Sequence, residues 1–279
     1  QLFDQALIAG STNGDPQYAL MTVVLYLYNE AFARLDPGYA AAVGIVLFLI
    51  IFTFTLVQPL VFLGLFGPLL PQVSGFDTAT SLQWFVPGIV VMSALVATSM
   101  TGSNLQIEMQ TGAHERLLVA PVRRSSLLVG RALKEIVPVV VQALIIVAVV
   151  VPFGFDLHPA GIAVGLVIVS AFGVGLGALS YALAVASKGE EWVFWTVQQT
   201  LMFPLLLLAG ILLPIDGGPG WIRFLSDLNP LTYVVEAERV LFAGDVLDAA
   251  VLQGTLAAAA TCALGLVVGI RVMRSGTAG

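Results

Sequence analysis

Six long apolar stretches limit what this chain can fold into. A helix that crosses a bilayer needs about 20 predominantly apolar residues, and in lipid the backbone polar groups must be satisfied within the helix itself. The alternating pattern of a membrane barrel is absent. The stretches are 39–70, 85–106, 136–153, 160–186, 192–213 and 247–270. The sequence therefore predicts an all-α polytopic membrane protein with six transmembrane helices.

Composition excludes other classes of protein. The chain has 279 residues, of which 58% are apolar and 10% are charged, whereas an average soluble domain has about 25% charged residues. This excludes a soluble enzyme and also a disordered chain, which would need low hydrophobicity and high charge. The net charge of -6 argues against nucleic-acid binding, which favours a basic face.

The first stretch is too long for a simple span. As one helix, residues 39–70 would extend about 48 Å at about 1.5 Å per residue, whereas the hydrocarbon core is about 30 Å thick. Either the helix is tilted and overhangs the core, or the stretch is a hairpin that turns near Gln58-Pro59. The hairpin would give seven spans.

The positions of Lys and Arg predict the orientation. With six spans and both ends inside, every basic residue except Arg223 and Arg239 faces the cytoplasm. This agrees with the positive-inside rule, which the inverted arrangement would violate. We therefore expect a multi-pass protein with a cytoplasmic C-terminus.

Two polar segments are candidate functional elements. Glu108–Lys134 is basic and predicts a cytoplasmic amphipathic helix, a turn and the entry to the third span. It is either a docking surface for a cytosolic partner or an ordinary positive-inside loop. The segment between the last two stretches has Trp221, Phe224 and Tyr233 among charged residues. It predicts amphipathic helices in the outer leaflet, either an extracellular gate or an interfacial connector.

Small residues recur in the fourth stretch. The residues predicted to pack helices closely are Gly161, Gly165, Gly173 and Gly177. Gly173, Gly175 and Gly177 also spell G-x-G-x-G, but a dinucleotide site would need a preceding strand.

Catalytic and metal-binding patterns are missing from the sequence. His114 and His158 have no partners at metal-ligand spacing, and no nucleophile–base pair is evident. A P-loop needs Gly before Lys, but Lys134 follows Leu133 and Lys188 follows Ser187. The apolar stretches contain no central ionisable residue, which argues against a secondary transporter and against a channel with a charged filter. We expect no enzymatic activity, and a pump would draw its energy from another subunit.

From about residue 55 to 271 the chain resembles the permease subunit of a type-2 ABC exporter, of the daunorubicin-resistance and nodulation-export type. The resemblance includes TLVQPLVFLGLFGPLLP at 55–71 and FVPGIVVMSAL at 85–95. A cytoplasmic pattern matches at Glu108, Thr111, Gly112, Glu115, Arg116, Leu117, Leu118 and Pro121, with a departure at Ala113-His114. An outer pattern matches at Leu213-Pro214, Pro219, Trp221, Asn229-Pro230, Tyr233 and Arg239.

This resemblance implies a role and partners. The chain would move amphiphilic cargo (drug, lipid, glycolipid or lipo-oligosaccharide) out across a bacterial plasma membrane, as in multidrug resistance. It would bind no cofactor, while two ABC ATP-binding subunits hold ATP and Mg. A second copy or a paralogous permease would complete the transporter among membrane lipids. The implied ATPase-docking loop is Glu108, Thr111, Gly112, Glu115, Arg116, Leu117, Pro121, Arg123 and Arg124. The implied outer gate helices, which are short and re-entrant, contain Pro214, Trp221, Asn229, Pro230, Tyr233 and Arg239.

Residues 1–57 instead resemble the end of a sugar ABC importer permease of the maltose and glycerol-phosphate type. The Phe3-Asp4 stretch and the Gly14–Pro16 turn match that pattern, but the importer's coupling motif is absent. Two segments follow, an importer-like 1–57 and an exporter domain 58–279, joined by natural fusion, by engineering or by artefact. The alternatives to export are a carbohydrate ABC importer permease and a membrane scaffold without transport.

Overall fold

In the residues that it describes, the computed structural model consists of helices joined by turns, without strands, which confirms the all-α polytopic class. Those residues are 26, 29–34, 37–67, 69, 78–110, 124–187, 190–212, 215 and 219–275. The chain divides into two compact units, Gln1–Gln58 (unit 1) and Pro59–Gly279 (unit 2).

Unit 1 contains a π-helical turn, η1 (Asn29–Ala33), and most of helix α3 (Pro37–Phe66). Arg34 forms an ion pair with Glu30 at 2.7 Å. The chain does not reverse at Gln58-Pro59, because Pro59 lies inside α3. The hairpin alternative, with its seventh span, is therefore wrong. A proline is tolerated in a membrane helix where local adjustments satisfy the freed carbonyl.

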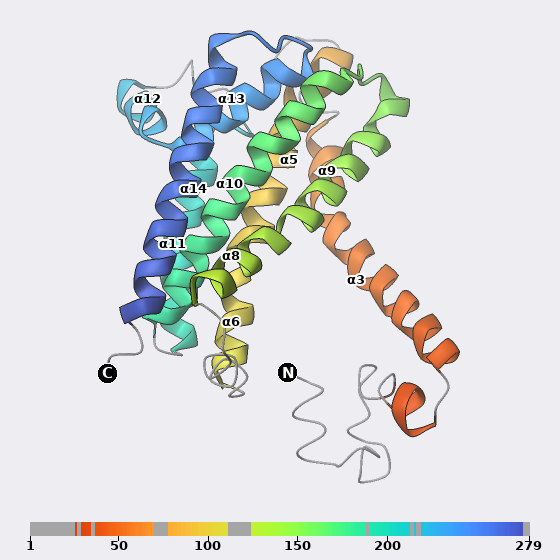
Figure 1. Ribbon diagram of the computed structural model, residues 1–279. Coiled ribbons are helices and arrows are strands. Elements are labelled where there is room, and N and C mark those ends of the chain that lie inside the picture. Colours follow the sequence, from red (N-terminus) through yellow and green to blue (C-terminus); the bar gives the residue numbers. More distant parts are fainter. Residues whose placement is uncertain are drawn as a thin grey trace. The chain divides into compact units, whose positions relative to one another are not determined.

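Unit 2 contains the remaining helices (Figure 1). They are α5 (Thr78–Ser99), α6 (Thr101–Gln110), α8 (Arg124–Lys134), α9 (Ile136–Val150), the 3-10 turn η2 (Val151–Phe153), α10 (Pro159–Ala186), α11 (Glu191–Leu208), α12 (Gly220–Asp227), α13 (Pro230–Phe242) and α14 (Ala249–Ser275).

Four helical stretches of the described chain are long and apolar enough to cross a membrane. They are Thr80–Gln110, Leu128–Phe153, Pro159–Ala186 and Ala249–Met273, which correspond to the second, third, fourth and sixth predicted spans. The fifth predicted span is helix α11, which is not among the four. Its first half contains Glu191, Gln198 and Gln199, which make it less apolar.

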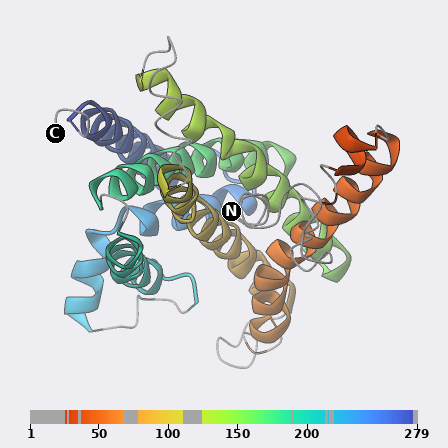
Figure 2. The ribbon, with the colours of Figure 1, turned by 90° about the horizontal axis from the view of Figure 1, so that it is seen from below.

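Helix α10 forms the centre of unit 2 and runs alongside α14 (Figures 1 and 2). Backbone contact explains their close approach: a Cβ atom on Gly175 would lie 2.6 Å from the carbonyl carbon of Thr261, and one on Gly265 would overlap the carbonyl of Gly175. Small residues permit such contact between membrane helices. Gly175 therefore sets the α10–α14 distance.

The four glycines predicted to pack helices contact three other parts of unit 2. Added Cβ atoms on Gly161 and Gly165 would overlap the Leu241 carbonyl and the Glu238 carboxyl of α13. One on Gly173 would lie 3.1 Å from a methyl of Thr98 on α5. At Gly177 the nearest atoms, on Glu135 and Thr101, are 3.8 Å away, which is an ordinary contact.

Candidate functional site

Within unit 2, α6 and α8 lie toward one end and α12 and α13 toward the other (Figure 1). Polar side chains form contacts at both ends. We refer to these ends as the α6/α8 end and the α12/α13 end. Among the described residues no group of three or more His, Cys, Asp or Glu is placed to hold a metal ion.

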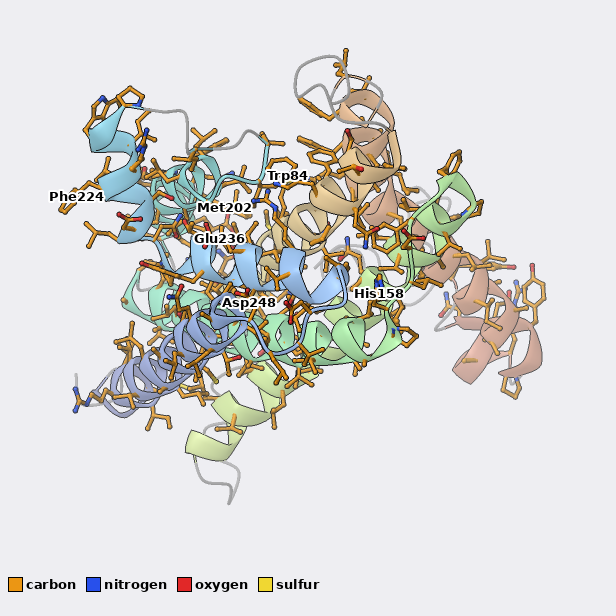
Figure 3. The ribbon with its side chains drawn as sticks, turned by 90° about the horizontal axis from the view of Figure 1, so that it is seen from above. Trp84, His158, Met202, Phe224, Glu236 and Asp248 are labelled. Atoms are coloured by element: carbon orange, nitrogen blue, oxygen red, sulfur yellow. The ribbon has the colours of Figure 1, made fainter. Side chains whose placement is uncertain are left out.

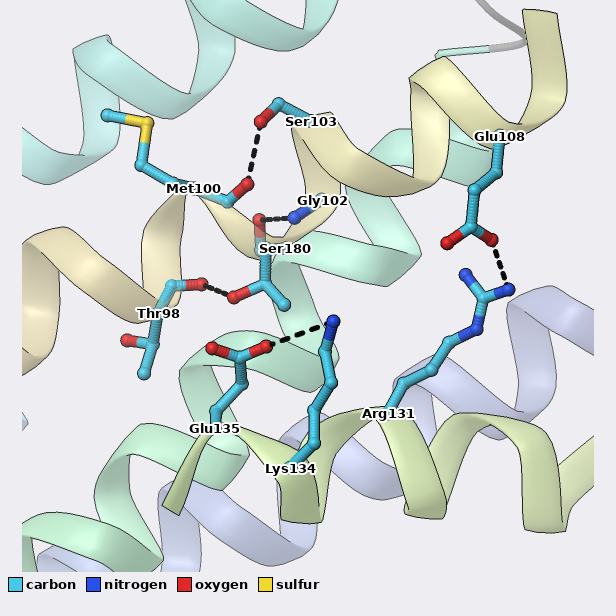
Figure 4. Close-up of polar contacts among 10 residues, drawn as sticks. Thr98, Met100, Gly102, Ser103, Glu108, Arg131, Lys134, Glu135 and Ser180 are labelled. Atoms are coloured by element: carbon cyan, nitrogen blue, oxygen red, sulfur yellow. Dashed lines mark hydrogen bonds and ion pairs between the residues drawn. The ribbon is translucent and has the colours of Figure 1, made fainter. Parts of the chain in front are cut away.

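At the α6/α8 end, Arg131 of α8 forms an ion pair with Glu108 of α6 (Figure 4). The Arg131 side chain is 15% exposed and that of Glu108 is 37% exposed. The Arg131 guanidinium also lies 5.9 Å from the ring centroid of Tyr181 on α10. Arg131 therefore links three helices at this end.

Helix α8 is amphipathic and leads directly into α9. Leu128 and Ala132 are buried, whereas Leu133 and Lys134 are exposed. Lys134 lies 3.7 Å from the carboxylate of Glu135, the residue between the two helices (Figure 4). Charged groups at this position fit the end of a span, where long side chains reach the interface.

A break between α5 and α6 at Met100 is closed by side chains from α10 and α11. The carbonyl of Ser99 accepts hydrogen bonds from Ser180 Oγ at 2.7 Å and from Gln198 Nε2 at 2.5 Å. Ser180 Oγ in turn accepts from the Gly102 amide at 3.0 Å (Figure 4). Backbone groups freed at a helix end need such partners when buried, so Ser180 and Gln198 fix the break in place.

Most of the implied docking loop lies outside the described residues. Two members of the docking loop are described: Glu108, in the last turn of α6, and Arg124, the first residue of α8. The members that lie outside the described residues are Thr111, Gly112, Glu115, Arg116, Leu117, Pro121 and Arg123. The predicted cytoplasmic amphipathic helix stays a prediction over 111–123. The structure describes the two helices that flank this segment in the sequence, α6 and α8, which are joined by the Glu108–Arg131 ion pair.

At the α12/α13 end, Asn229 starts helix α13. Its side chain accepts from the Leu231 amide at 3.0 Å and donates to the Leu205 carbonyl of α11 at 2.8 Å. Pro230 follows at the first helical position, where its missing N–H costs nothing. The Tyr233 hydroxyl donates to the Asp227 carbonyl at 2.7 Å. Hydrogen bonds at the start of α13 therefore connect this helix to both α11 and α12.

Arg239 lies farther along α13 and faces α5. Its guanidinium lies 3.7 Å from the ring centroid of Trp84. Its Nε donates to the Trp84 carbonyl at 3.1 Å, and its Nη2 donates to the Gly210 carbonyl at 2.8 Å. Trp84 was not singled out from the sequence, although it lies just before the apolar stretch that begins at 85.

A cavity of about 170 Å³ opens beside Arg239. Figure 3 views this end from above, with Trp84 and Glu236 labelled. Helices α5, α12 and α13 and the residues after α11 line the cavity, and its polar lining includes Arg223, Ser226, Asp227, Thr232, Glu236 and Arg239.

The structure brings together four of the six predicted outer residues, Asn229, Pro230, Tyr233 and Arg239, on α13 and its cap. Trp221 lies on α12 with 65% of its surface exposed, as an aromatic anchor at an interface would. Pro214 lies outside the described residues.

A further set of hydrogen bonds joins α5, the start of α10 and α13. The carbonyl of Phe242 accepts from Gln83 Nε2 at 2.6 Å and from His158 Nδ1 at 3.0 Å. Gln83 Oε1 also accepts from the Asp156 amide at 3.2 Å. From the sequence, His158 was considered only as a metal ligand. In the structure its ring donates to the carbonyl of the last residue of α13 and so restrains the end of that helix (Figure 3).

Comparison with known proteins gives the family. Residues 45–243 match the family described as ABC-2 type transporter. The chain is 27% identical over 189 residues to the daunorubicin resistance ABC transporter permease protein DrrB1 of Streptomyces coeruleorubidus, covering 67% of this chain and 66% of that protein. It is 32% identical over 193 residues to the putative transport permease ycf38 of Cyanophora paradoxa, with the same coverage.

One similarity spans nearly the whole chain. The probable doxorubicin resistance ABC transporter permease protein DrrC of Mycobacterium tuberculosis (strain ATCC 25618 / H37Rv) is 26% identical over 275 residues, or 95% of this chain and 93% of that protein. This alignment extends into residues 1–57, the part that resembles an importer. The family match covers most of unit 2, including both polar ends. The chain is a member of the ABC-2 type transporter family, a permease subunit of an ABC transporter.

Proposed function

We propose that this chain is the membrane-spanning subunit of an ATP-driven exporter that moves amphiphilic cargo out across a bacterial plasma membrane. Two ATP-binding subunits would hold ATP and Mg, and a second copy or a paralogous permease would complete the pathway. This chain would bind no cofactor and catalyse no reaction. The observation that carries the proposal is the Glu108–Arg131 pair, which joins the two helices flanking the basic segment 111–123.

The contacts at the α6/α8 end offer a route for coupling. A push on 111–123 would act on α6 and α8 together, because Glu108 and Arg131 join them. From α6 it would reach the α5–α6 break, where Ser180 and Gln198 hold the Ser99 carbonyl. ATP binding would thereby bias two arrangements of the bundle, which is all that coupling requires.

The α12/α13 end would be the exit. Helix α13 has 13 residues and spans about 20 Å, too short to cross a core of about 30 Å. The apolar sides of the long helices offer surface for a lipid-like cargo, and the polar cavity beside Arg239 would face its head group. The names of two relatives refer to resistance to daunorubicin and doxorubicin, and a drug-like amphiphile is our proposed cargo class.

The coupling loop can be tested in the assembled transporter. Glu115→Ala and Arg116→Ala should each weaken binding of the ATP-binding subunit, or should abolish the stimulation of its ATPase activity by the permease. Arg271→Gln, a charge change on α14 outside this loop, is the matched control and should leave stimulation unchanged. Normal binding and normal stimulation in both loop variants would refute the docking assignment.

Export itself needs a separate assay. In inverted vesicles that contain the complex, ATP should drive a fluorescent cationic amphiphile into the lumen. The same complex in right-side-out vesicles should expel it only when ATP is supplied inside. Uptake that instead requires an external binding protein and a sugar would support the importer alternative, and the absence of any co-purifying ATPase would support a scaffold.

A further inference from the structure

Helix α13 carries a carboxyl group in the packed interior of unit 2. Glu238 is 0% exposed, and neither of its carboxyl oxygens has a hydrogen-bond partner among the described residues. By contrast, Asn229, the N-cap residue of the same helix, is 4% exposed and makes hydrogen bonds through both its side-chain oxygen and its side-chain nitrogen. Buried polar groups are normally satisfied, and an exception calls for an explanation.

The carboxyl occupies a place that a side chain of α10 would otherwise fill. A Cβ atom added to Gly165 would overlap the Glu238 carboxyl. One turn earlier, a Cβ on Gly161 would overlap the Leu241 carbonyl. Two glycines of α10 thus let α13 approach backbone to backbone and enclose Glu238 between the helices.

Among the residues that the structure describes, no charged group on the neighbouring helices is placed to compensate the carboxyl. Helix α5 contains no titratable residue over Thr78–Ser99, and the only one within α10 is Tyr181, which lies at the other end beside Arg131. On α14, Cys262 lies against Gly175, and Arg271 and Arg274 are in the last turns.

Titratable groups close in sequence to Glu238 or to Gly165 are directed elsewhere. On α13 itself, the Tyr233 hydroxyl donates to the Asp227 carbonyl. His158, about two turns before Gly165, is bonded to the Phe242 carbonyl. Arg239 lies over Trp84, and Glu236 is exposed on the cavity side. Arg223 and Asp227 of α12 line the same cavity.

This geometry favours the neutral acid. An ionised carboxylate without a partner is strongly disfavoured in an apolar interior, so such groups hold their proton instead. Burial raises the pKa of Glu238 to about 8. A neutral carboxyl can remain seated against Gly165, whereas an ionised one must reach water or a cation, which requires α13 to move.

We propose that Glu238 is a proton-binding site that keeps α13 seated on α10, and that loss of this proton releases α13 from Gly161 and Gly165. The ligand is a proton, and the responding element is the short helix that also carries Arg239 and the Asn229 cap. The inference depends on the packing of one chain and not on the cargo or on the ATP-binding subunit. Its failure and failure of the proposed export are therefore distinguishable.

The test measures protonation and distance in the full chain, purified in lipid nanodiscs. Infrared difference spectra report the carbonyl stretch of a neutral carboxylic acid. Spin labels at Val167→Cys on α10 and at Leu228→Cys, just before α13, are both at exposed positions. They report the separation of α10 from the N-terminal end of α13 in a Cys262→Ala background. In the wild type the carbonyl band should disappear as the pH passes about 8, and a second, longer distance should appear over the same range.

Variants assign the signal to one residue. Glu238→Gln keeps the shape of the neutral acid, so it should lack the band and show one short distance at every pH. Glu236→Gln, an exposed glutamate on the same helix, should titrate like the wild type. If Glu238→Gln does not fold, Glu238→Met provides the same comparison. A wild type whose distance does not change between pH 6 and pH 10, or whose band is unaltered by substitution of Glu238, would overturn the proposal.

Discussion

The guanidinium of Arg239 lies over the indole of Trp84, 3.7 Å from the ring centroid, and donates to the Trp84 carbonyl as well. One side chain of α13 therefore holds both the ring and the backbone of α5. A second hydrogen bond, to the Gly210 carbonyl, adds the end of α11. The fixed fork of an arginine suits such a three-way contact better than the single ammonium of a lysine.

Replacing Arg239 by lysine should therefore destabilise unit 2 despite preserving the charge. We expect a loss of about 1–3 kcal/mol, from the cation–π contact and from carbonyls left without donors. The measurement is denaturant unfolding in detergent micelles, followed by Trp fluorescence. Arg223→Lys, on exposed α12, should change stability by less than about 0.5 kcal/mol. Equal effects at both sites would contradict the role given to the stacked pair.

Reversing the Glu108–Arg131 pair tests whether it couples α6 to α8. Each single reversal, Glu108→Arg or Arg131→Glu, should reduce ATPase stimulation in the assembled complex, and the double reversal should restore part of it. Folding stability should change by no more than about 1 kcal/mol in the singles, because the pair is partly exposed and solvent screens it. A double variant no better than the sum of its singles would show that the pair does not act as a unit.

Glycine substitutions should divide according to what the new Cβ atom meets. Gly175→Ala would place a methyl 2.6 Å from the Thr261 backbone, so α10 and α14 must separate and stability should fall by about 1–3 kcal/mol. Gly130→Ala in α8 has nothing within 4 Å of its new atom and should stabilise by about 0.5–1 kcal/mol. Thermal unfolding of both variants in one detergent checks the contrast, and a neutral Gly175→Ala would be the contrary result.

The thermal stability of the wild type should depend on pH through Glu238. The folded chain holds this proton up to about pH 8, whereas an exposed glutamate releases it near 4.5. Between these values the folded state binds more protons than the unfolded state, so stability falls as pH rises, by at most about 1.4 kcal/mol per unit, and levels off above 8. Glu238→Gln should lack this component, and superimposable pH profiles for the two proteins would count against a buried neutral acid.

Single cysteines can establish the orientation. In a Cys262→Ala background, Ala243→Cys at the α13–α14 turn should react with a membrane-impermeant maleimide added to intact cells. Glu190→Cys, just before α11, should react only after permeabilisation. Both positions are exposed, so access to solvent does not limit either reaction. The reverse pattern would place the C-terminus outside.

The sequence predicted the long helices because hydrophobicity alone decides which segments enter a bilayer. The stretch 160–186 lies within α10, and the stretch 247–270 begins two residues before α14 and ends five residues before its last residue. The Asn229-Pro230 pair, matched through the family resemblance, has a local cause that the structure displays: an N-cap followed by proline is a helix-start signal.

What the sequence did not predict depends on contacts between distant residues. Glu238 was placed in an interfacial segment because it stands among charged residues, yet it is buried since Gly165, far away in the chain, leaves room for it. The break at Met100 interrupts a stretch that reads as continuous, and its stability rests on Ser180 and Gln198. Trp84 gains its role only once Arg239 is folded against it.

The shared carbonyl of Phe242 has a mechanical consequence for α13. Gln83 and His158 both donate hydrogen bonds to this oxygen, so the C-terminal end of the helix has little freedom to translate. The opposite end depends on the Asn229 side chain and its bond to α11. If α13 leaves α10, it should swing about Phe242 as a hinged arm, and the largest excursion should occur at Asn229.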